Sequence, residues 1–349
     1  MVSHAAEIVR KGLYERRWTD GLPGERSLSI QLGVSRPTLR KALGKLRSEG
    51  LLETSQGKPT RPTKRALRKS AKEKAKRRII LLSPDPLHRM PAHAVYVFDA
   101  LRTALAESGH SLETRVFHPK PGTERQAVAK LLDEDEGAIR ILYRQDKDVH
   151  REFHGRGAAC VVFGNQHPNY PFPAAGIDHP ATCRHAINHL QRNGFTRSNI
   201  ALLVASHTFA GDMENIAVIR EELGDAAHVF QLPPDPDAIP AALDRICKQL
   251  PVPAALVFVR SRHVLSAISH LCIVRRLRVP DEISFVCLSH DPVFDWFCPA
   301  ITRYQPNSTE IASSLATKVL RIASGATPSL KPSNYFPEFI RGGTVGRGG

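Results

Sequence analysis

The 349-residue chain carries a formal net charge of +15, and almost all of that charge lies at one end. Residues 1–78 contain 21 Lys and Arg against 7 Asp and Glu, whereas the rest of the chain is close to neutral. Such an asymmetry is the electrostatic footprint of a protein that binds a polyanion. No segment approaches the roughly eighteen consecutive apolar residues of a membrane-spanning helix, and the N-terminus lacks the apolar core of a signal peptide, so we expect a cytoplasmic protein.

Two short helices joined by a tight turn are predicted near the N-terminus. The first follows Leu22-Pro23-Gly24-Glu25-Arg26, and the second begins after Ser35, with Gly33 in the turn. Ser35 is a good N-cap, and because Pro37 has no N–H, we expect the Ser35 hydroxyl to accept a hydrogen bond from the Thr38 amide. An apolar stripe faces the core (Leu39, Ala42, Leu43 and Leu46), and a basic row faces outward (Arg36, Arg40 and Arg47). Such a unit can present side chains to the major groove of DNA.

A short β-hairpin pattern follows in residues 50–61, with Gly57 at its tip. Residues 3–61 as a whole resemble the winged-helix DNA-binding domain of the GntR family of bacterial repressors. The resemblance is carried by Leu-Pro-x-Glu-Arg at 22–26, Leu-Gly-Val-Ser-Arg-x-Thr at 32–38 and Glu-Gly-Leu-Leu at 49–52. It implies contacts to phosphates and base edges from Arg26, Ser35, Arg36, Thr38 and Arg40, and entry of Gly57 and Lys58 into the minor groove. The chain departs from this family at Gly44, where a mid-helix glycine destabilises by about 1 kcal/mol relative to Ala.

Residues 62–78 form a basic segment with one acidic residue and no apolar periodicity. One interpretation is a flexible tether that its own charge keeps extended. The other is a segment that becomes ordered on DNA and adds phosphate contacts. We therefore expect a DNA-binding domain at 1–61, a linker at 62–78 and a second domain at 79–349.

Strands and helices alternate along the second region, which predicts parallel sheets covered by helices on both faces. The expected strands are 79–83, 112–117, 138–142, 159–163, 200–204, 228–230, 254–259 and 283–288. The expected helices are 94–108, 123–133, 146–156, 181–193, 212–223, 238–250 and 264–276. A second series is expected to open near Gly176-Ile177-Asp178, and about 270 residues are too many for one compact sheet, so we expect a two-lobed α/β fold.

This second region resembles the effector domain of the LacI/GalR family, which has the periplasmic-binding-protein type 1 fold. The resemblance is carried by His189-Leu190-x-x-x-Gly194-Phe195, by Val279-Pro280-Asp281-Glu282-Ile283-Ser284 and by a terminal strand ending at Arg341. It implies that the chain returns to the first lobe near Pro306. It also implies a ligand in the cleft between the lobes, outside the carboxyl ends of the strands.

By their positions at strand ends, the candidate ligand-binding residues are Asp85, Tyr143, Arg144, Asn165, Ser206, Arg262, Asp291 and Trp296. Arg262 stands where sugar-binding relatives usually carry an Asp. We therefore expect an electropositive cleft that selects an anion, which a guanidinium can hold with two parallel hydrogen bonds. The alternative is that Arg262 points to solvent or pairs with a carboxylate such as Asp291. Asp178 has two interpretations as well, a cleft residue or the N-cap of the helix that follows it.

Cysteine and histidine spacing predicts no metal site and no cofactor. The six cysteines form no Cys-x-x-Cys pair and have no His at ligand spacing, and the sixteen histidines form no His-Glu-x-x-His pattern. We expect reduced, mostly buried thiols.

The leading hypothesis is a ligand-responsive bacterial transcriptional regulator, expected to be a repressor. As a homodimer it would bind a pseudo-palindromic operator in double-stranded DNA, and its effector would be a sugar, a sugar acid or a related metabolite. One alternative is a ligand-independent DNA-binding protein with a vestigial cleft. The other is a DNA-tethered enzyme, which the sequence disfavours because it has no Gly-x-Ser-x-Gly, P-loop or Gly-x-Gly-x-x-Gly motif.

Overall fold

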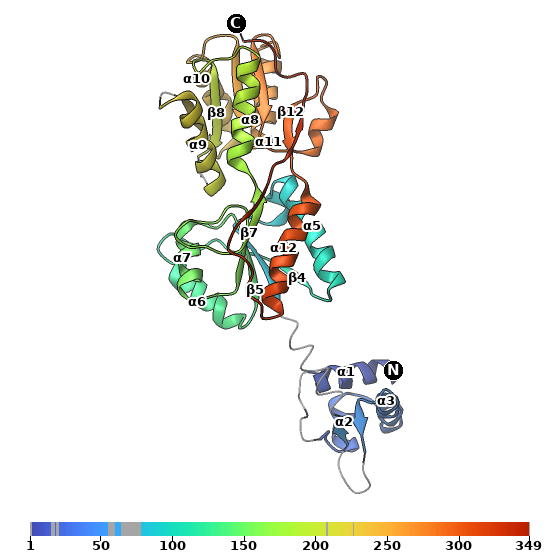
Figure 1. Cartoon of the computed structure of the whole chain (residues 1–349). Coiled ribbons are helices and arrows are strands. Elements are labelled where there is room, and N and C mark those ends of the chain that lie inside the picture. Colours follow the sequence, from blue (N-terminus) through green and yellow to red (C-terminus); the bar gives the residue numbers. More distant parts are fainter. Residues whose placement is uncertain are drawn as a thin grey trace. The chain divides into compact units, whose positions relative to one another are not determined.

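Three helices pack together near the start of the chain, within the residues that the structure describes. The structure is a computed structural model, and it describes residues 2–14, 18, 21–54, 60–63, 78–206, 209–225 and 227–348. The three helices are α1 (Val2–Tyr14), α2 (Glu25–Gln31) and α3 (Arg36–Ser48). They belong to the first of two compact units, residues 1–77, and the second unit is residues 78–349 (Figure 1).

Helix α3 begins as its sequence predicts. The Ser35 hydroxyl accepts a hydrogen bond from the Thr38 amide at 3.3 Å, and Gly33 turns the chain with a φ of 60°. The predicted apolar stripe is buried against α1 and Leu28; it consists of Leu39, Ala42, Leu43 and Leu46. The basic face of α3 is therefore left to the solvent.

Two short strands follow α3. Strands β1 (Leu52–Glu53) and β2 (Arg61–Pro62) pair antiparallel, which confirms the two arms of the predicted hairpin. The expected tip, with Gly57 and Lys58, lies outside the described residues. The Leu22 amide donates a hydrogen bond to the Thr60 carbonyl at 2.8 Å, and this bond ties β2 to the segment that precedes α2.

The first lobe of the second unit is a six-stranded parallel sheet in the order β13-β7-β6-β5-β3-β4. Its strands are β3 (Ile79–Ser83), β4 (Leu112–Val116), β5 (Ile139–Tyr143), β6 (Cys160–Phe163), β7 (Ala174–Ile177) and β13 (Ser333–Tyr335). Its helices are η1 (Leu87–Arg89), α5 (Ala92–Glu107), α6 (Glu124–Glu134), α7 (Lys147–Gly155) and α12 (Ser308–Ala323). Side chains alternate along β3, so that Ile79 packs under α5 and α12 whereas Ile80 packs under α6 and α7. Both faces are therefore covered, as a parallel sheet requires.

The second lobe is a six-stranded sheet in the order β14-β12-β11-β10-β8-β9. Its strands are β8 (Ile200–Ala205), β9 (His228–Leu232), β10 (Ala254–Phe258), β11 (Ile283–Cys287), β12 (Thr302–Gln305) and β14 (Glu338–Ile340). Its helices are α8 (His179–Arg192), α9 (Ala210–Leu223), η2 (Pro236–Ala238), α10 (Ile239–Cys247), α11 (Ser261–Ala267), the π-helix η3 (Ile268–Val274) and η4 (Pro292–Trp296). Helices α8 and α9 cover one face, and α10 and α11 cover the other. The edge strand β14 pairs antiparallel with β12 and is the exception to the expected parallel order.

The chain passes between the lobes at three places in the described part of the second unit. It leaves the first lobe after β7, returns after β12 and leaves again after β13 (Figure 1). The implied return near Pro306 is thus confirmed. Two details differ from expectation: β7 belongs to the first sheet and does not open the second, and η3 continues α11 as a π-helix.

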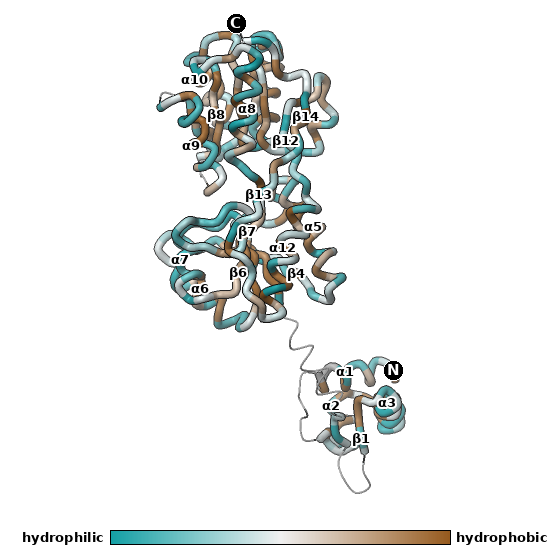
Figure 2. Tube along the Cα trace, viewed as in Figure 1, coloured by the Kyte–Doolittle hydropathy of each residue, from teal (hydrophilic) through white to brown (hydrophobic). Residues whose placement is uncertain are grey.

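Hydrophobic residues gather along the central strands, and hydrophilic residues along the outer faces of the helices (Figure 2). None of the helices in the described residues is long and apolar enough to cross a membrane.

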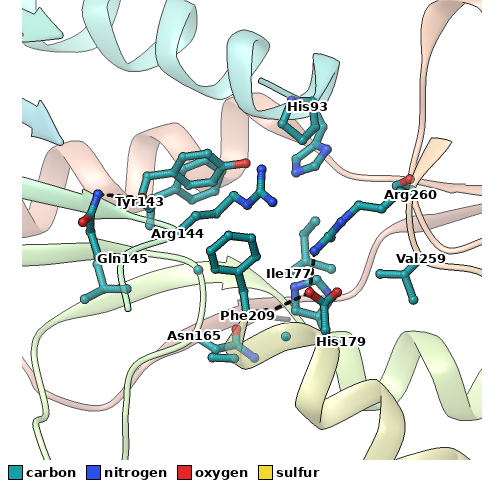
Figure 3. A pocket seen from close by; sticks show the side chains of 18 of the residues that line it. His93, Tyr143, Arg144, Gln145, Asn165, Ile177, His179, Phe209, Val259 and Arg260 are labelled. Atoms are coloured by element: carbon teal, nitrogen blue, oxygen red, sulfur yellow. Dashed lines mark hydrogen bonds and ion pairs between the residues drawn. The ribbon is translucent and has the colours of Figure 1, made fainter. Parts of the chain in front are cut away.

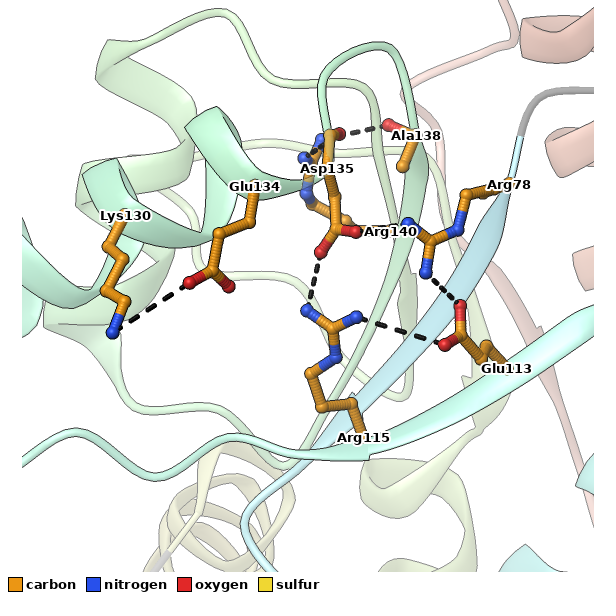
Figure 4. A network of polar contacts seen from close by, with 8 residues as sticks. All are labelled: Arg78, Glu113, Arg115, Lys130, Glu134, Asp135, Ala138 and Arg140. Carbon is orange, nitrogen blue, oxygen red and sulfur yellow. Dashed lines mark hydrogen bonds and ion pairs between the residues drawn. The ribbon is translucent and has the colours of Figure 1, made fainter. Parts of the chain in front are cut away.

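The second unit begins at a cluster of ion pairs around a buried carboxylate (Figure 4). Asp135 is 2% exposed at its side chain and pairs with Arg78 at 2.6 Å and with Arg115 at 2.5 Å. Arg78 also pairs with Glu113 at 2.6 Å, and Arg140 donates hydrogen bonds to the carbonyls of residues 135 and 138. Arg78, which the sequence assigns to the linker, is therefore held by the second unit.

Candidate functional site

The outward face of α3 is basic along its whole length. Its exposed cations are Arg36, Arg40, Lys41, Lys45 and Arg47, and α3 contains no acidic residue. Arg36 and Arg40 are four residues apart and lie on the same side of the helix. Cations attract DNA phosphates whatever the sequence, and Arg can bond bidentately to a guanine edge, so this face suits the major groove.

Two polar contacts occupy part of this face. The Arg40 Nε donates to the Glu25 carboxylate of α2 at 2.7 Å, and the Ser35 and Thr38 hydroxyl oxygens lie 2.8 Å apart. Because the Arg40 side chain is 62% exposed, water screens its ion pair, and DNA phosphate can replace the carboxylate. Arg26 is exposed on α2.

The two lobes of the second unit enclose a cavity of about 110 Å³, which we call the inner cavity (Figure 3). It lies at the carboxyl ends of the parallel strands, where open α/β folds place ligands. Side chains from both lobes form its walls, among them Tyr143, Arg144, Asn165, Phe209, Asp212 and Arg260.

Two arginines from different lobes point into the inner cavity (Figure 3). Arg144 is 13% exposed and pairs with Asp85 at 3.3 Å, and Arg260 is 16% exposed and pairs with Asp212 at 2.5 Å. The Nε atoms of both arginines are buried without a hydrogen-bond partner. Burial lowers the pKa of Arg144, because the protein interior solvates a cation poorly. An anion between the two guanidinium groups would meet donors from both lobes.

Two side-chain contacts join the lobes beside these arginines. The Arg144 guanidinium lies 4.1 Å from the centre of the Phe209 ring, a cation–π contact. The Asn165 amide donates a hydrogen bond to the Glu214 carboxylate of α9, and burial raises the pKa of Glu214 to about 7. A change in the spacing of the lobes would break both contacts.

Two half-buried histidines flank the arginines in the inner cavity (Figure 3). His93 lies in the first turn of α5, and His179 opens α8. Burial lowers the pKa of His93 to about 3 and that of His179 to about 4. Both rings are therefore neutral at neutral pH, and the Nδ1 of His93 is buried without a hydrogen-bond partner.

A second cavity of about 170 Å³, the outer cavity, adjoins the inner one. The shared wall consists of Pro91, His93, Val259, Arg260 and Ser289. The outer cavity is further lined by Arg89, Arg262 and Asp291. Cations therefore outnumber carboxylates in it.

Metal-ligating side chains do not cluster in the described residues, where no group of three or more His, Cys, Asp or Glu could hold an ion. The six cysteines are free thiols.

Residues 2–61 match the sequence profile of the bacterial regulatory proteins of the gntR family, and residues 187–345 match that of a periplasmic binding protein-like domain. The chain joins a GntR-type DNA-binding domain to a periplasmic-binding-protein-like domain.

The GntR-type domain is similar to the corresponding part of curated regulators. The fatty acid metabolism regulator protein of Shewanella putrefaciens is 41% identical over 61 residues, which make up 17% of this chain and 26% of that protein. The chain thus spans about a quarter of the length of the curated relatives it matches.

The periplasmic-binding-protein-like domain has the fold of LacI-family regulators. A LacI family transcriptional regulator from Mycobacterium smegmatis superposes with a TM-score of 0.64 at 20% identity, over 77% of this chain and 99% of that one. The transcriptional regulator CelR in its cellobiose complex superposes with a TM-score of 0.65 at 17% identity, over 93% of this chain and 100% of that one. At these identities the likeness shows the fold alone.

The residues predicted to bind ligand in the periplasmic-binding-protein-like domain fall into three groups. Tyr143, Arg144 and Asn165 line the inner cavity, and Asp85 pairs with Arg144 beside it. Arg262 and Asp291 line the outer cavity. Ser206 is exposed after β8 and Trp296 is 88% exposed, and neither lines these two cavities.

The prediction did not include several residues of the inner cavity, among them His93, His179, Phe209, Asp212 and Arg260. Each lies at or near the start of a helix, and the prediction considered the ends of strands. Asp178 is the N-cap of α8, since its carboxylate accepts a hydrogen bond from the Ala181 amide at 2.9 Å.

Proposed function

We propose that this protein binds operator DNA through its GntR-type domain, and that a small anion between the lobes of the second domain changes its affinity for that DNA. The observation that carries the proposal is the convergence of Arg144 and Arg260, one from each lobe, on the inner cavity. A ligand that bonds both would favour one spacing of the lobes. Only such differential binding can shift a conformational equilibrium.

On the DNA side, we propose that Arg36 and Arg40 contact base edges and phosphates from α3, with Arg26, Ser35 and Thr38 beside them. Gly57 and Lys58 are proposed for the minor groove on their resemblance to the GntR wing. A single recognition helix buries too little surface for tight specific binding, so we propose a homodimer on a pseudo-palindromic operator. A regulator of this kind acts in the cytoplasm, and repression is its proposed mode.

Anion binding would change the affinity for DNA through a movement of the two lobes. A change in the spacing of the lobes would alter the contact of Arg144 with Phe209 and that of Asn165 with Glu214. Coupling free energies between an effector site and a second site are typically 1–3 kcal/mol. A coupling free energy of this size corresponds to a change in operator affinity of about 5- to 150-fold.

A second candidate function is ligand-independent DNA binding with a cavity that needs no effector. Asp85 and Asp212 already pair with the two arginines, and this observation favours it. We propose no catalytic step and no cofactor for either candidate.

A thermal-shift screen of the full chain tests the effector proposal, with carboxylates, phosphates, sugar acids and neutral sugars as ligands. A ligand at 100 times its Kd stabilises the domain that binds it by about 2.7 kcal/mol. Arg260→Gln should abolish the shift, and Arg192→Gln, on the exposed face of α8, should leave it unchanged. Each active compound is then titrated against upstream DNA of the neighbouring genes. If no compound shifts both stability and DNA affinity, the ligand-independent function is the correct one.

A further inference from the structure

One side-chain pair that joins the lobes combines a carboxyl group with a hydrogen-bond acceptor that lacks a donor. Asn165 follows β6 in the first lobe, and Glu214 lies in α9 of the second. The Nδ2 of Asn165 donates a hydrogen bond to the Oε2 of Glu214. The Oδ1 of Asn165 is buried, and no donor among the described residues reaches it. The pair is therefore one donor short.

A proton on Glu214 supplies the missing donor. A carboxylate only accepts hydrogen bonds, whereas a carboxylic acid also donates one. The amide and the acid can then pair with a hydrogen bond in each direction, from Nδ2 to Oε2 and from the Oε1 hydroxyl to Oδ1. Buried acceptors without a donor are rare in folded proteins, so the count of donors and acceptors favours the protonated form.

The surroundings of Glu214 favour the same form. Its side chain is half-buried, and its pKa is raised from 4.5 to about 7, mainly because burial penalises the charged carboxylate. The negative charge of Asp178, the N-cap of α8, also raises this pKa, whereas the hydrogen bond from Asn165 lowers it. Both forms of the carboxyl group are therefore populated at neutral pH.

Ionisable side chains lie on both lobes around this pair. They are Arg144 and His167 in the first lobe and His179, Arg184, Asp212 and Arg260 in the second. The three arginines pair with carboxylates other than that of Glu214. Burial lowers the pKa of His179 to about 4, so its ring is neutral at neutral pH, and His167 stacks on Tyr170. Within the described residues, no ion pair offsets the cost of a charge on Glu214.

We infer that the second domain binds a proton on Glu214 when its lobes come together, and that the acid so formed donates a hydrogen bond to the Oδ1 of Asn165. The proton comes from the solvent, and it is released when the lobes move apart and water reaches the carboxyl group. Acidification therefore favours the lobe spacing of the structure, because a ligand with different affinities for two states shifts the equilibrium between them. The inference holds whether or not an effector binds between the lobes.

Urea unfolding of the full chain between pH 5.5 and 8 tests for the proton. A carboxyl group whose pKa is raised by folding stabilises the folded chain fully below about pH 4.5, and this contribution is lost as the pH rises through about 7. Glu214→Gln introduces a neutral amide that both donates and accepts, so it should lack this dependence. Relative to this variant, the folding equilibrium constant of the parent protein should fall by about 10-fold or more from pH 5.5 to pH 8.

Glu107→Gln, at the exposed end of α5, is the matched control and should follow the pH dependence of the parent protein. The comparisons cancel the opposite contributions of His93 and His179, because all three proteins contain these histidines. If Glu214→Gln and Glu107→Gln show the same pH dependence, Glu214 takes up no proton in this range and the inference is overturned.

Spin labels measure the spacing of the lobes. They are attached at two exposed positions, through Lys147→Cys at the start of α7 and Arg220→Cys on α9, in a chain that also carries Cys298→Ser because that native thiol is exposed. Double electron–electron resonance should give one narrow distance at pH 5.5 and an additional, longer distance at pH 8. Glu214→Gln in the same chain should keep the narrow distance at both pH values. If the distances in the labelled parent do not change with pH, the proton does not act on the lobes, and the inference is overturned.

Discussion

Arg260 and Arg262 stand two positions apart in the chain but differ in environment. Arg260 is the N-cap of α11 and is 16% exposed, with its guanidinium against the nearly inaccessible Asp212. Arg262 is exposed and lines only the outer cavity. Successive helical residues are separated by about 100° around the axis, so side chains two positions apart face different ways. The sequence alone marks Arg262 as the notable substitution, but Arg260 is the less exposed of the two cations.

On the DNA-binding face, Arg36→Ala and Arg40→Ala should each weaken operator binding by about 1–3 kcal/mol if these side chains contact bases bidentately. The pair between Arg40 and Glu25 adds a second expectation. Glu25→Gln removes the carboxylate that competes with DNA for Arg40, so it should strengthen binding. Fluorescence anisotropy with labelled operator measures all three.

Asp99→Asn is the control for the loss of an acidic residue, because Asp99 is exposed and pairs with Arg102 in the second unit. It should leave operator affinity unchanged. If Arg36→Ala and Arg40→Ala both bind like the parent protein, α3 does not enter the groove.

The two histidines of the inner cavity make stability depend on pH. The pKa values of His93 and His179 are about 3 and 4 in the folded chain and about 6.5 when unfolded, so the unfolded chain binds more protons between these values. Stability is therefore full above pH 6.5 and is lost as the pH falls below it, by about 1.4 kcal/mol per pH unit for each ring. His93→Gln should reduce the loss between pH 7 and 5.5 by about 1.4 kcal/mol in urea unfolding. His88→Gln, at an exposed position, is the control, and equal losses in both variants would contradict the lowered pKa of His93.

At the scale of an element, helix α3 has a well-capped N-terminus but an interior residue of low helix propensity. Ser35 caps its first turn and Gly33 supplies the turn before it, whereas Gly44 lies in its interior on the exposed face. A Cβ added at Gly44 would meet no heavy atom within 4 Å. The glycine therefore lowers helix stability, and no neighbouring atom in the described structure requires the absence of a side chain at this position.

Gly44→Ala should stabilise the first unit by about 1 kcal/mol, because alanine loses less backbone freedom on entering a helix. Its transition in urea, followed by circular dichroism, measures the change. Gly33→Ala is the opposite control: its φ of 60° is strained for alanine, so it should destabilise. A destabilised Gly44→Ala variant would mean that residue 44 is not in the interior of a helix.

At the scale of the whole molecule, charge and cavity chemistry are divided between the two units. Residues 1–78 carry a net charge of +14. Arg78 belongs electrostatically to the second unit, where Asp135 and Glu113 hold it. The cations that remain available for DNA in the linker are therefore those of residues 64–77, which lie outside the described residues.

Replacing the Lys and Arg residues of 64–77 with Gln should weaken binding to specific and non-specific DNA about equally. For every DNA phosphate that the variant no longer neutralises, the slope of log K against log salt should fall in magnitude by about 0.9. Arg78→Gln is the control, because that side chain is engaged within the second unit, and it should leave the slope unchanged. An unchanged slope in the multiple variant would identify the segment as a spacer.

The sequence by itself determined what depends on near neighbours in the chain. The N-cap at Ser35, the stripe from Leu39 to Leu46 and the buried strand Ile79–Ser83 follow from local hydrogen bonding and hydrophobic periodicity, and the structure confirms all three. The GntR and LacI resemblances rest on the same short-range patterns. The positions of residues at strand ends predicted part of the lining of the inner cavity, because parallel strands end at one edge of their sheet.

Only the tertiary structure decided which segments meet. Helix α12 and strand β13 lie in the first lobe, although β12 before them and β14 after them lie in the second. The inner cavity joins Arg144 to Phe209 and Arg260 to Asp212 across long stretches of chain, and Arg89 lines the outer cavity together with Arg260. Local propensity and hydrophobic period do not encode such pairs, because they arise from how two sheets pack about three chain crossings.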